Sequence, residues 1–491
     1  MSEAPIRSAV SPCFTPQNSW RTELATKAAV VIDAQDYFRA AREAMMAARK
    51  RIMLIGWDFD ARIRLRGEPL EPGEPVKVGE FILWLVERNP ELEIYLLRWD
   101  KGAIKSLARG ETIWTTLKWM RHPRIHTKLD GVHPTGASHH QKIVVVDDCF
   151  AFCGGIDMTT DRWDTRAHRD DDPDRVKPNG KAYTPWHDAT TALEGPVAAA
   201  LGDLARERWR RATGREIAPV PGRDDCWPNY LEPHFRNMPV AISRTLPPVA
   251  GNAHVGEIEQ LYIDLIGSAQ RFIYAESQYF ASRRIAEAIA RRLREPNGPE
   301  IVLVNPLTAD GWLEPIAMDT ARARLVEALR RIDTDGRLRV YHPQTAGGVP
   351  IYVHAKIMVV DDEVLRIGSS NMNNRSLGLD TECDVTFDSR TGGGDEERTI
   401  RAIRIGLIAE HLGREPDEVE SAIGAQGSMI RAIEALRDEG RSLIPYVTPN
   451  LNAIETWLAD NEVLDPERPD EMFEMTAKSG LFRRGWFRRP R

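Results

Sequence analysis

Short apolar runs alternate with amphipathic segments along most of this chain, and the alternation predicts strands and helices in turn. Runs rich in β-branched and aromatic residues fit buried strands at 51–60, 92–100, 271–280 and 299–307. Segments with apolar residues three and four positions apart fit helices at 78–89 and 284–295. The order strand, helix, strand therefore occurs twice, which is typical of α/β layers around a buried sheet.

A duplicated segment is the most informative feature of the sequence. HQKIVVVDDCFAFCGGIDM begins at His140 and HAKIMVVDDEVLRIGSSNM begins at His354, and the two align without gaps with nine identities in nineteen positions. The predicted strands and helices upstream of the two copies follow the same order. Because 491 residues exceed what one hydrophobic core usually holds, the duplication indicates two similar α/β lobes.

Proline content and polarity suggest how the chain is divided. Prolines are frequent between about residues 213 and 255, which disfavours regular helix and marks a segment connecting the lobes. Polar, turn-rich stretches at 161–185 and 388–397 should form surface loops, and the first is a candidate for lining a substrate entrance. The predicted units are an N-terminal extension (1–27), a first lobe (28–240), a second lobe (241–413), a helical region (414–477) and a basic aromatic tail (478–491).

Each copy of the repeat carries a histidine and, two positions later, a lysine: His140 with Lys142, and His354 with Lys356. Alternate side chains of an extended strand share a face, so each imidazole should point the same way as its ammonium group. Lysine stabilises the anionic oxygens of a phosphodiester, and histidine acts near neutral pH as nucleophile or proton donor. If the lobes pack so that the pairs converge, one histidine attacks phosphorus, the other protonates the leaving oxygen, and no metal is required.

An aspartate follows each histidine by seven positions, and two interpretations of it stay open. As the last member of a His-x-Lys-x4-Asp pattern, Asp147 or Asp361 is a candidate catalytic residue. As the residue that ends the apolar run IVVV or IMVV, each is equally a candidate structural carboxylate that fixes a turn. Each copy also has a glycine fourteen residues after its histidine, so a chance match is a poor explanation of the pattern.

Composition narrows the classes of function. The net charge is −7, whereas proteins that hold nucleic-acid backbones usually carry a basic excess. The first residues lack the apolar run of a signal peptide, and no run of about 18 apolar residues occurs, so we expect a cytoplasmic protein without membrane spans. The five cysteines are sparse and odd in number, which favours a reducing compartment. Cys149 and Cys153 are expected to be buried structural thiols and not a metal pair.

The last residues mix aromatic and basic side chains. In 478–491, leucine, phenylalanine and tryptophan alternate with five arginines. Cations attract an anionic lipid leaflet and aromatics lie at its interface, so this tail suits peripheral membrane contact. A disordered basic tail fits the segment equally well, because Gly485 and Pro490 weaken a helix.

The repeated residues resemble the phospholipase D superfamily, whose mark is two His-x-Lys-x4-Asp motifs on a pseudo-twofold pair of α/β/α sandwich lobes. The resemblance extends from roughly residue 28 to 413. In detail, the sequence is more similar to the phosphatidylcholine-hydrolysing phospholipases D than to the short nucleases of the superfamily. Beyond the two motifs, it includes AFCGGIDMTTDRWDT (151–165), PWHDATTALEGP (185–196), AESQYF (275–280) and GSSNMNNRS (368–376).

The resemblance implies roles for the motif residues. His140 would attack phosphorus to form a phosphohistidine, and His354 would protonate the departing head-group alcohol. Lys142, Lys356 and Asn371 would contact the phosphate. From sequence alone, the two histidines are interchangeable in these roles.

Further site residues follow from the same resemblance. Glu382 is similar to a carboxylate that orients a histidine and fixes its tautomer. Alignment of the two halves places His168, which is not a carboxylate, opposite Glu382. Asp164, a nearby carboxylate, is therefore the candidate for the equivalent role in the first half.

Three more residues are expected at or near the site. Asp157 occupies the position equivalent to Asn371, and since phosphate would repel a carboxylate, we expect Asp157 to engage a neighbouring histidine or lysine. Trp186 and His187 should lie near the site, although a packed tryptophan beside a hydrogen-bonded histidine is an equal alternative.

The implied activity is hydrolysis of the distal phosphodiester bond of glycerophospholipids to phosphatidic acid and an alcohol, with head-group exchange when an alcohol replaces water. The alternatives are a phosphatidyltransferase of the cardiolipin synthase type and, less favoured, a nuclease. A phospholipid is the expected partner, and no nucleic acid and no cofactor are expected.

Overall fold

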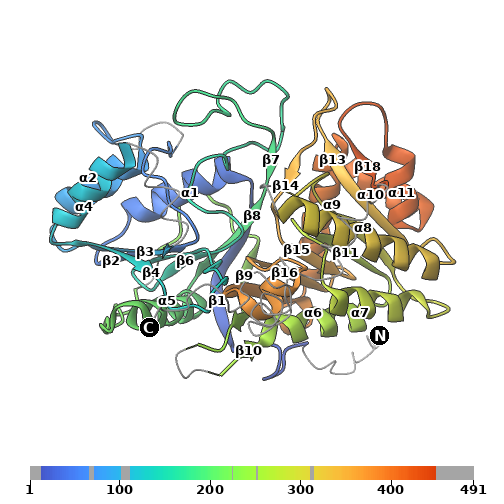
Figure 1. Ribbon diagram of the computed structural model, residues 1–491, viewed down its shortest axis with the longest axis horizontal. Coiled ribbons are helices and arrows are strands. Elements are labelled where there is room, and N and C mark those ends of the chain that lie inside the picture. Colours follow the sequence, from blue (N-terminus) through green and yellow to red (C-terminus); the bar gives the residue numbers. More distant parts are fainter. Residues whose placement is uncertain are drawn as a thin grey trace, which may run out of the picture.

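The computed structural model describes residues 13–65, 71–100, 111–223, 225–249, 253–309 and 314–448. The two halves of the chain lie side by side, the first coloured blue to green on the left of Figure 1 and the second yellow to red on the right. In the first half the elements are β1 (Arg21–Ile32), α1 (Ala34–Met46), β2 (Arg51–Gly56), α2 (Val78–Arg88), β3 (Glu93–Trp99), α4 (Glu111–Arg121), β4 (Ile125–Asp130), β5 (Ile143–Val146), β6 (Phe150–Gly154), β7 (Trp186–His187), β8 (Ala189–Glu194) and α5 (Pro196–Thr213).

The second half repeats this succession and adds elements at its end. They are β9 (Phe235–Leu246), β10 (Val255–Gly256), α6 (Glu257–Ser268), β11 (Phe272–Glu276), α7 (Arg283–Leu293), β12 (Glu300–Val304), α8 (Glu314–Ile332), β13 (Leu338–Gln344), β14 (Tyr352–Val353), β15 (Ile357–Val360), β16 (Val364–Gly368), a π-helical turn (Arg375–Leu379), β17 (Glu382–Asp388), a 3-10 turn (Ser389–Thr391), α9 (Glu396–Leu412), α10 (Pro416–Gln426), α11 (Met429–Leu436) and β18 (Ser442–Pro445).

Strand order demonstrates the duplication. The first half is ordered β4-β3-β2-β5-β6-β8-β1 and the second β13-β12-β11-β15-β16-β17-β9, so each strand has a counterpart in the same place. Within each half, the βαβ units make parallel pairs and the hairpin after the histidine motif makes antiparallel ones. The predicted α/β class is confirmed, as are the strands and helices expected from the apolar runs.

The two halves share one continuous sheet, because β9 pairs with β1 on one side and with β17 on the other. The predicted boundary near residue 240 is therefore wrong: it falls inside a twelve-residue strand within the supposed connecting segment. The predicted extension is too long as well, since β1 begins at Arg21.

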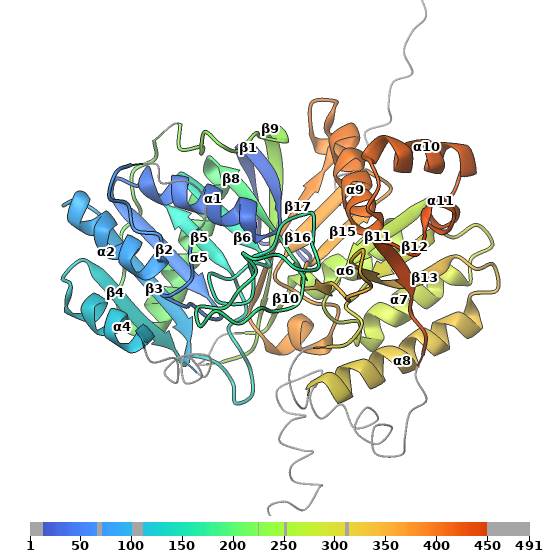
Figure 2. The same cartoon turned by 90° about the horizontal axis from the view of Figure 1, so that it is seen from above.

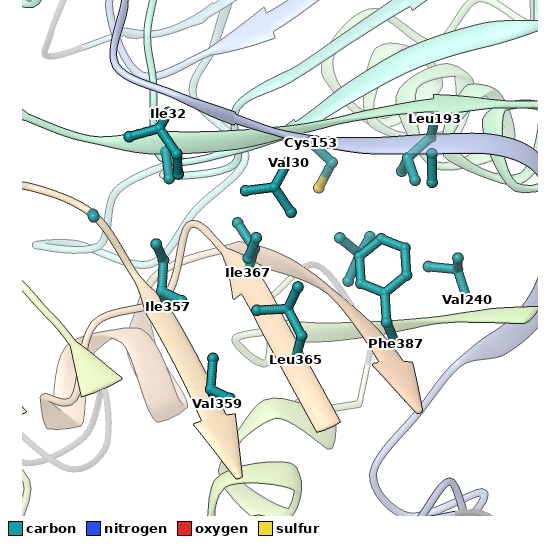
Figure 3. Close-up of a cluster of buried hydrophobic side chains, with 14 of the residues drawn as sticks. Val30, Ile32, Cys153, Leu193, Val240, Ile357, Val359, Leu365, Ile367 and Phe387 are labelled. Atoms are coloured by element: carbon teal, nitrogen blue, oxygen red, sulfur yellow. The ribbon is translucent and has the colours of Figure 1, made fainter. Parts of the chain in front are cut away.

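Hydrophobic cores separate the layers. Helices α1, α2 and α4 cover the outer face of the first half, and α6, α7 and α8 cover that of the second; Figure 2 shows the two groups at opposite ends of the molecule. A third core lies between the halves. There Val30, Ile32 and Leu193 of the first half face Ile367 and Phe387 of the second (Figure 3). This apolar interface holds the two histidine motifs in a fixed relation, since close-packed interiors resist displacement.

The C-terminal region is only partly as predicted. Helices α10 and α11 confirm the helical pattern, but β18 adds an unexpected edge strand that pairs with β13. Residues 449–477 of the predicted helical region and the tail at 478–491 lie outside the described residues. The stretch 388–397 includes the end of β17 and the start of α9, and 161–185 is not purely a surface loop, because His168 within it is 1% exposed.

Cysteine pairing corrects another expectation. Cys149 and Cys226 form a disulfide, with Cα atoms 6.2 Å apart, so Cys149 is not a free thiol. Cys153 is a buried free thiol as expected, beside Cys383 of the other half at an Sγ–Sγ distance of 3.6 Å.

Within the described residues, no helix is long and apolar enough to cross a bilayer.

Candidate active site

Both histidine motifs lie in extended segments that lead directly into a strand: His140 and Lys142 precede β5, and His354 and Lys356 precede β15. Each segment also bonds to the other half of the chain. The His140 N–H donates to the Thr381 carbonyl at 3.0 Å, and the His354 N–H donates to the His187 carbonyl at 2.7 Å. The two motifs are thus fixed along the line where the halves meet.

A carboxylate from the opposite half orients each imidazole. His140 Nδ1 lies 3.0 Å from both oxygens of Glu382, and His354 Nδ1 lies 2.7 Å from Asp188 Oδ2. The Ser369 and Ser376 hydroxyls donate to Glu382 and hold it in place. With Nδ1 bound to a carboxylate, each ring directs its Nε2 away from that carboxylate as the reactive atom.

Asp188 was missed in the sequence, and Asp164 was the wrong substitute. Strand register identifies the equivalence: Gly368 pairs with Asp384, two residues after Glu382, and Gly154 pairs with Thr190, two residues after Asp188. Asp164 instead accepts a hydrogen bond from the Trp186 N–H at 2.8 Å and lies 3.0 Å from His168 Nδ1.

The lysines complete the two half-sites. Lys142 Nζ lies 3.2 Å from Asp157 Oδ2, so Asp157 engages a lysine as expected. Lys356 Nζ donates hydrogen bonds to the carbonyl oxygen of His354 and, at 3.4 Å, to Gln278 Oε1. The amide of Asn371 is 3.5 Å from the same Gln278 oxygen, which brings Asn371 beside Lys356. Gln278 lies in the AESQYF segment but received no role from the sequence.

The electrostatics connect the two half-sites. Burial, together with Lys142 and Lys356, holds the pKa of His140 well below its ordinary value. Burial, Lys356, Arg162 and Lys142 do the same to the pKa of His354. Each histidine therefore feels the lysine of the other half, and both rings are neutral at rest.

Two further groups at the site have shifted pKa values. Burial and the charge of Lys142 lower the pKa of Lys356 to about 7, and burial raises the pKa of Glu382 to about 8. Clustered, buried groups with perturbed pKa values are typical of catalytic centres.

Asp147 and Asp361 do not belong to this centre. Asp147 accepts hydrogen bonds from the backbone N–H groups of Arg49, Lys50 and Arg51 at 2.7–2.8 Å. Asp361 does the same for residues 270–272. Both have positive φ (50° and 56°) in the turn after the motif strand, a conformation that aspartate tolerates. The structural interpretation is therefore the one that the contacts support.

Trp186 and His187 are neighbours in the sequence, but their side chains lie in different surroundings. The Trp186 ring stacks on Tyr352 with centroids 4.6 Å apart and lies 5.2 Å from the His354 ring, at the site. The Arg162 guanidinium lies 4.2 Å above Trp186. His187 is fully buried among carboxylates, and its ring contacts Glu276. Of the two interpretations of His187, a residue of the substrate site or a packed, hydrogen-bonded histidine, these buried contacts support the second.

The arrangement supplies the parts for displacement at phosphorus: two neutral imidazoles, each oriented by a carboxylate, and two ammonium groups that interact with both. A phosphodiester held by the lysines would have an imidazole available as nucleophile and another to exchange protons. The parts derive from both halves, so neither half alone holds a complete centre.

Comparisons with known proteins agree with this site. Residues 44–224 match a family model described as phospholipase D, and residues 262–396 match one described as cardiolipin synthase, PLD-like domain. Each half of the chain is thus matched by a model of this kind, and each match includes one of the histidine motifs.

Similar proteins carry related names. Phospholipase D A of Dictyostelium discoideum is 24% identical over 78% of this chain and 35% of its own length. Phospholipase D alpha 1 of Carica papaya is 24% identical over 77% of this chain and 64% of its own length. The chain thus spans less than two thirds of these relatives.

A solved structure shares the fold. Phosphatidylserine synthase of Haemophilus influenzae Rd KW20 has a TM-score of 0.53 at 13% identity, over 86% of this chain and 96% of that one. Its likeness shows the architecture alone. With a family model on each half and a histidine motif in both, this chain belongs to the phospholipase D superfamily.

Proposed function

We propose that this protein is a phospholipase D, which hydrolyses the distal phosphodiester bond of glycerophospholipids to phosphatidic acid and a free head-group alcohol. The observation that carries the proposal is the exchange of carboxylates: Glu382 of the second half orients His140, and Asp188 of the first half orients His354. Such an exchange makes one centre out of two motifs. The names of the relatives supply the substrate class.

The chemistry runs in two displacements. In the first, His140 Nε2 bonds to phosphorus while the bond from phosphorus to the head-group oxygen breaks, and His354 gives that oxygen its proton. In the second, His354 takes a proton from water, whose oxygen bonds to phosphorus as the bond to His140 breaks. Lys142 and Lys356 stabilise the charge on the phosphoryl oxygens in both steps.

His354 must carry a proton in the first step although it is neutral at rest. A phosphodiester anion placed near the ring, and Asp188 at 2.7 Å, both favour the imidazolium form. Substrate binding therefore brings the acid into the required state. The assignment of attack to His140 and of proton transfer to His354 rests on family resemblance.

Transfer to a second alcohol is the alternative outcome at the same centre. If a lipid or primary alcohol replaces water in the second displacement, the product is an exchanged phospholipid. The match of residues 262–396 to a cardiolipin synthase-type model favours this alternative. A nuclease remains the less favoured candidate, because the chain is acidic overall.

Membrane contact through 478–491 and a cytoplasmic location are further proposals. The disulfide between Cys149 and Cys226 removes one support for the cytoplasmic location, since disulfides are uncommon in reducing compartments. Deleting 478–491 should weaken sedimentation with anionic vesicles while leaving activity on a short-chain, monomeric substrate unchanged. Equal sedimentation of both forms would contradict a role for the tail.

The proposed activity can be tested by offering purified protein phosphatidylcholine, phosphatidylethanolamine, phosphatidylglycerol, and single- and double-stranded DNA, with and without a primary alcohol. We expect phosphatidic acid, and a phosphatidyl alcohol when the alcohol is present. His140→Ala and His354→Ala should each abolish turnover, whereas the matched control His254→Ala, at an exposed histidine, should not. Cleavage of DNA but of no lipid would refute the substrate class, and activity in both histidine variants would refute the mechanism.

A further inference from the structure

A second group of histidines and carboxylates lies buried directly behind the active site, where the two halves meet. The first half contributes Asp33, between β1 and α1, and His168 and His187. The second half contributes Glu410 in α9. Each of the four is at most 7% exposed, and the mechanism uses none of them.

The ligand atoms of these four residues converge. His168 Nε2 lies 3.1 Å from Glu410 Oε1 and 3.5 Å from Asp33 Oδ2. His187 Nδ1 lies 3.0 Å from the same Glu410 oxygen and 3.3 Å from Asp33 Oδ1. One ligand atom from each residue fits within a group whose members are all within 4.8 Å of one another. For bonds of about 2.0–2.2 Å, tetrahedral geometry separates neighbouring ligands by about 3.3–3.6 Å, close to the spacing found here.

The outer contacts of the histidines fit the same interpretation. His168 presents its other ring nitrogen to Asp164 at 3.0 Å, and His187 presents its own to Glu276 at 2.7 Å. A carboxylate behind each imidazole fixes the tautomer that directs a lone pair inward, as is usual for metal-bound histidine. The inward nitrogen of each ring is therefore available as a ligand.

Two of the inward atoms lack a hydrogen bond. Asp33 Oδ2 and His187 Nδ1 are buried and make none, although both residues are at most 1% exposed. Buried polar atoms normally find a partner, and leaving one unsatisfied is costly. A bound cation would satisfy both atoms at once.

We propose that Asp33, His168, His187 and Glu410 bind a zinc ion that joins the two halves of the chain. Two imidazole nitrogens and two carboxylate oxygens form a closed, four-ligand set, which is the arrangement of a structural and not of a catalytic zinc site. Zinc bound here bridges α9 of the second half to Asp33 after β1, to His168 in the loop before β7 and to His187 in β7 itself.

The site also positions the second catalytic histidine. Asp33 Oδ1 accepts a hydrogen bond from the Asp188 N–H at 3.1 Å, and the His187 carbonyl accepts one from the His354 N–H at 2.7 Å. Asp33 and His187 therefore connect the zinc to both His354 and its orienting carboxylate. Asp33 and His187 act as positioning residues, since neither reaches the phosphate centre.

Metal content tests the proposal without any substrate, so its outcome is independent of the proposed function. The protein is unfolded in guanidinium with a chelator, refolded with or without Zn²⁺, desalted and analysed by elemental mass spectrometry. We expect about one zinc per chain after refolding with Zn²⁺, together with a higher Tm than the zinc-free protein. Glu410→Gln and His168→Asn should each retain less than about a tenth of that zinc.

His139→Asn is the matched control, because His139 is also a buried histidine that contacts a carboxylate, Asp130, at 3.0 Å. It should keep the zinc of the wild type. For any variant that fails to refold, Co²⁺ added to the wild type gives a second measurement, since four-coordinate Co²⁺ absorbs strongly in the visible range. No zinc in the wild type, or equal zinc in Glu410→Gln, would overturn the proposal, and the cluster would then be held by protonated imidazoles.

Discussion

Replacing Asp188 with asparagine separates the two chemical steps of the proposed mechanism. Asp188 contacts the ring of His354, the proposed acid and base, whereas the hydrogen bond that orients His140 in the described structure comes from Glu382. Asparagine keeps the shape of the side chain and removes its charge. The imidazolium form of His354 therefore loses its nearest counter-charge.

The size of the effect follows from the geometry. His354 Nδ1 and Asp188 Oδ2 are 2.7 Å apart, and Asp188 is fully buried, so solvent screens the pair little. Opposite charges centred about 4 Å apart attract by about 4 kcal/mol at an effective dielectric constant of about 20. Loss of about 4 kcal/mol corresponds to a rate about 10³-fold lower for steps that need the imidazolium.

A substrate with a p-nitrophenyl leaving group gives the assay. p-Nitrophenolate departs without a proton, so attack by His140 needs little help from His354, whereas hydrolysis of the phosphohistidine still needs His354 to activate water. Asp188→Asn should release a rapid burst of p-nitrophenol about equal to the enzyme concentration, followed by turnover about 10³-fold slower than wild type.

The reciprocal variant is the control. Glu382→Gln should slow the burst itself, because Glu382 orients the nucleophile. A burst slowed equally in both variants, or steady turnover in Asp188→Asn within a factor of about 10 of wild type, would refute the separate roles of the two histidines.

Three further predictions concern the charge of Lys356, the turn that Asp147 holds and the disulfide between Cys149 and Cys226. The Lys356 side chain is charged below its pKa of about 7 and neutral above it, so kcat/KM should fall as the pH rises through 7. Lys356→Arg should flatten that decline, because arginine stays charged. An unchanged pH profile in the variant would exclude Lys356 as the titrating group. Asp147→Ala should lower the free energy of unfolding by about 1–3 kcal/mol in urea while leaving kcat of the folded protein unchanged, because its carboxylate holds a turn through three backbone amides and pairs with the Arg223 guanidinium at 3.7 Å. Reductant, or Cys149→Ser, should lower the free energy of unfolding by about 2–4 kcal/mol, since the disulfide closes a loop with a separation of 77 residues, and the two treatments should not add.

The sequence was enough to find both motifs and the α/β class, because the same local demands recur in each half. The turn after each motif strand needs an aspartate with positive φ, and Gly154 and Gly368 each face a neighbouring strand so closely that a Cβ would clash with it. These requirements place the same residue types at the same spacing in both halves, and a gapless alignment detects that repetition.

Asp188 escaped the alignment because the first half carries a longer segment after its motif. Glu382 follows Gly368 by fourteen residues, and the fourteenth residue after Gly154 is His168, whereas Asp188 comes twenty residues later. Only strand pairing, which the sequence does not display, restores the equivalence.

The boundary strand and the disulfide were hidden for other physical reasons. Pro239 argued against a strand, but β17 pairs with β9 only from Val240 onward, so Pro239 lies where the strand has one neighbour and its missing N–H costs little. The partner of Cys149 lies 77 residues away in an irregular segment, and no sequence pattern reports that approach.

The central claim is that imidazoles from both halves meet at one phosphorus atom. A crystal structure of the protein with orthovanadate, a mimic of phosphorus during displacement, measures this directly. We predict one vanadate per chain, with His140 Nε2 bonded to vanadium and His354 Nε2 within about 3–3.5 Å of the opposite oxygen. A separate vanadate at each motif, or one that contacts the histidine of a single half, would contradict the claim.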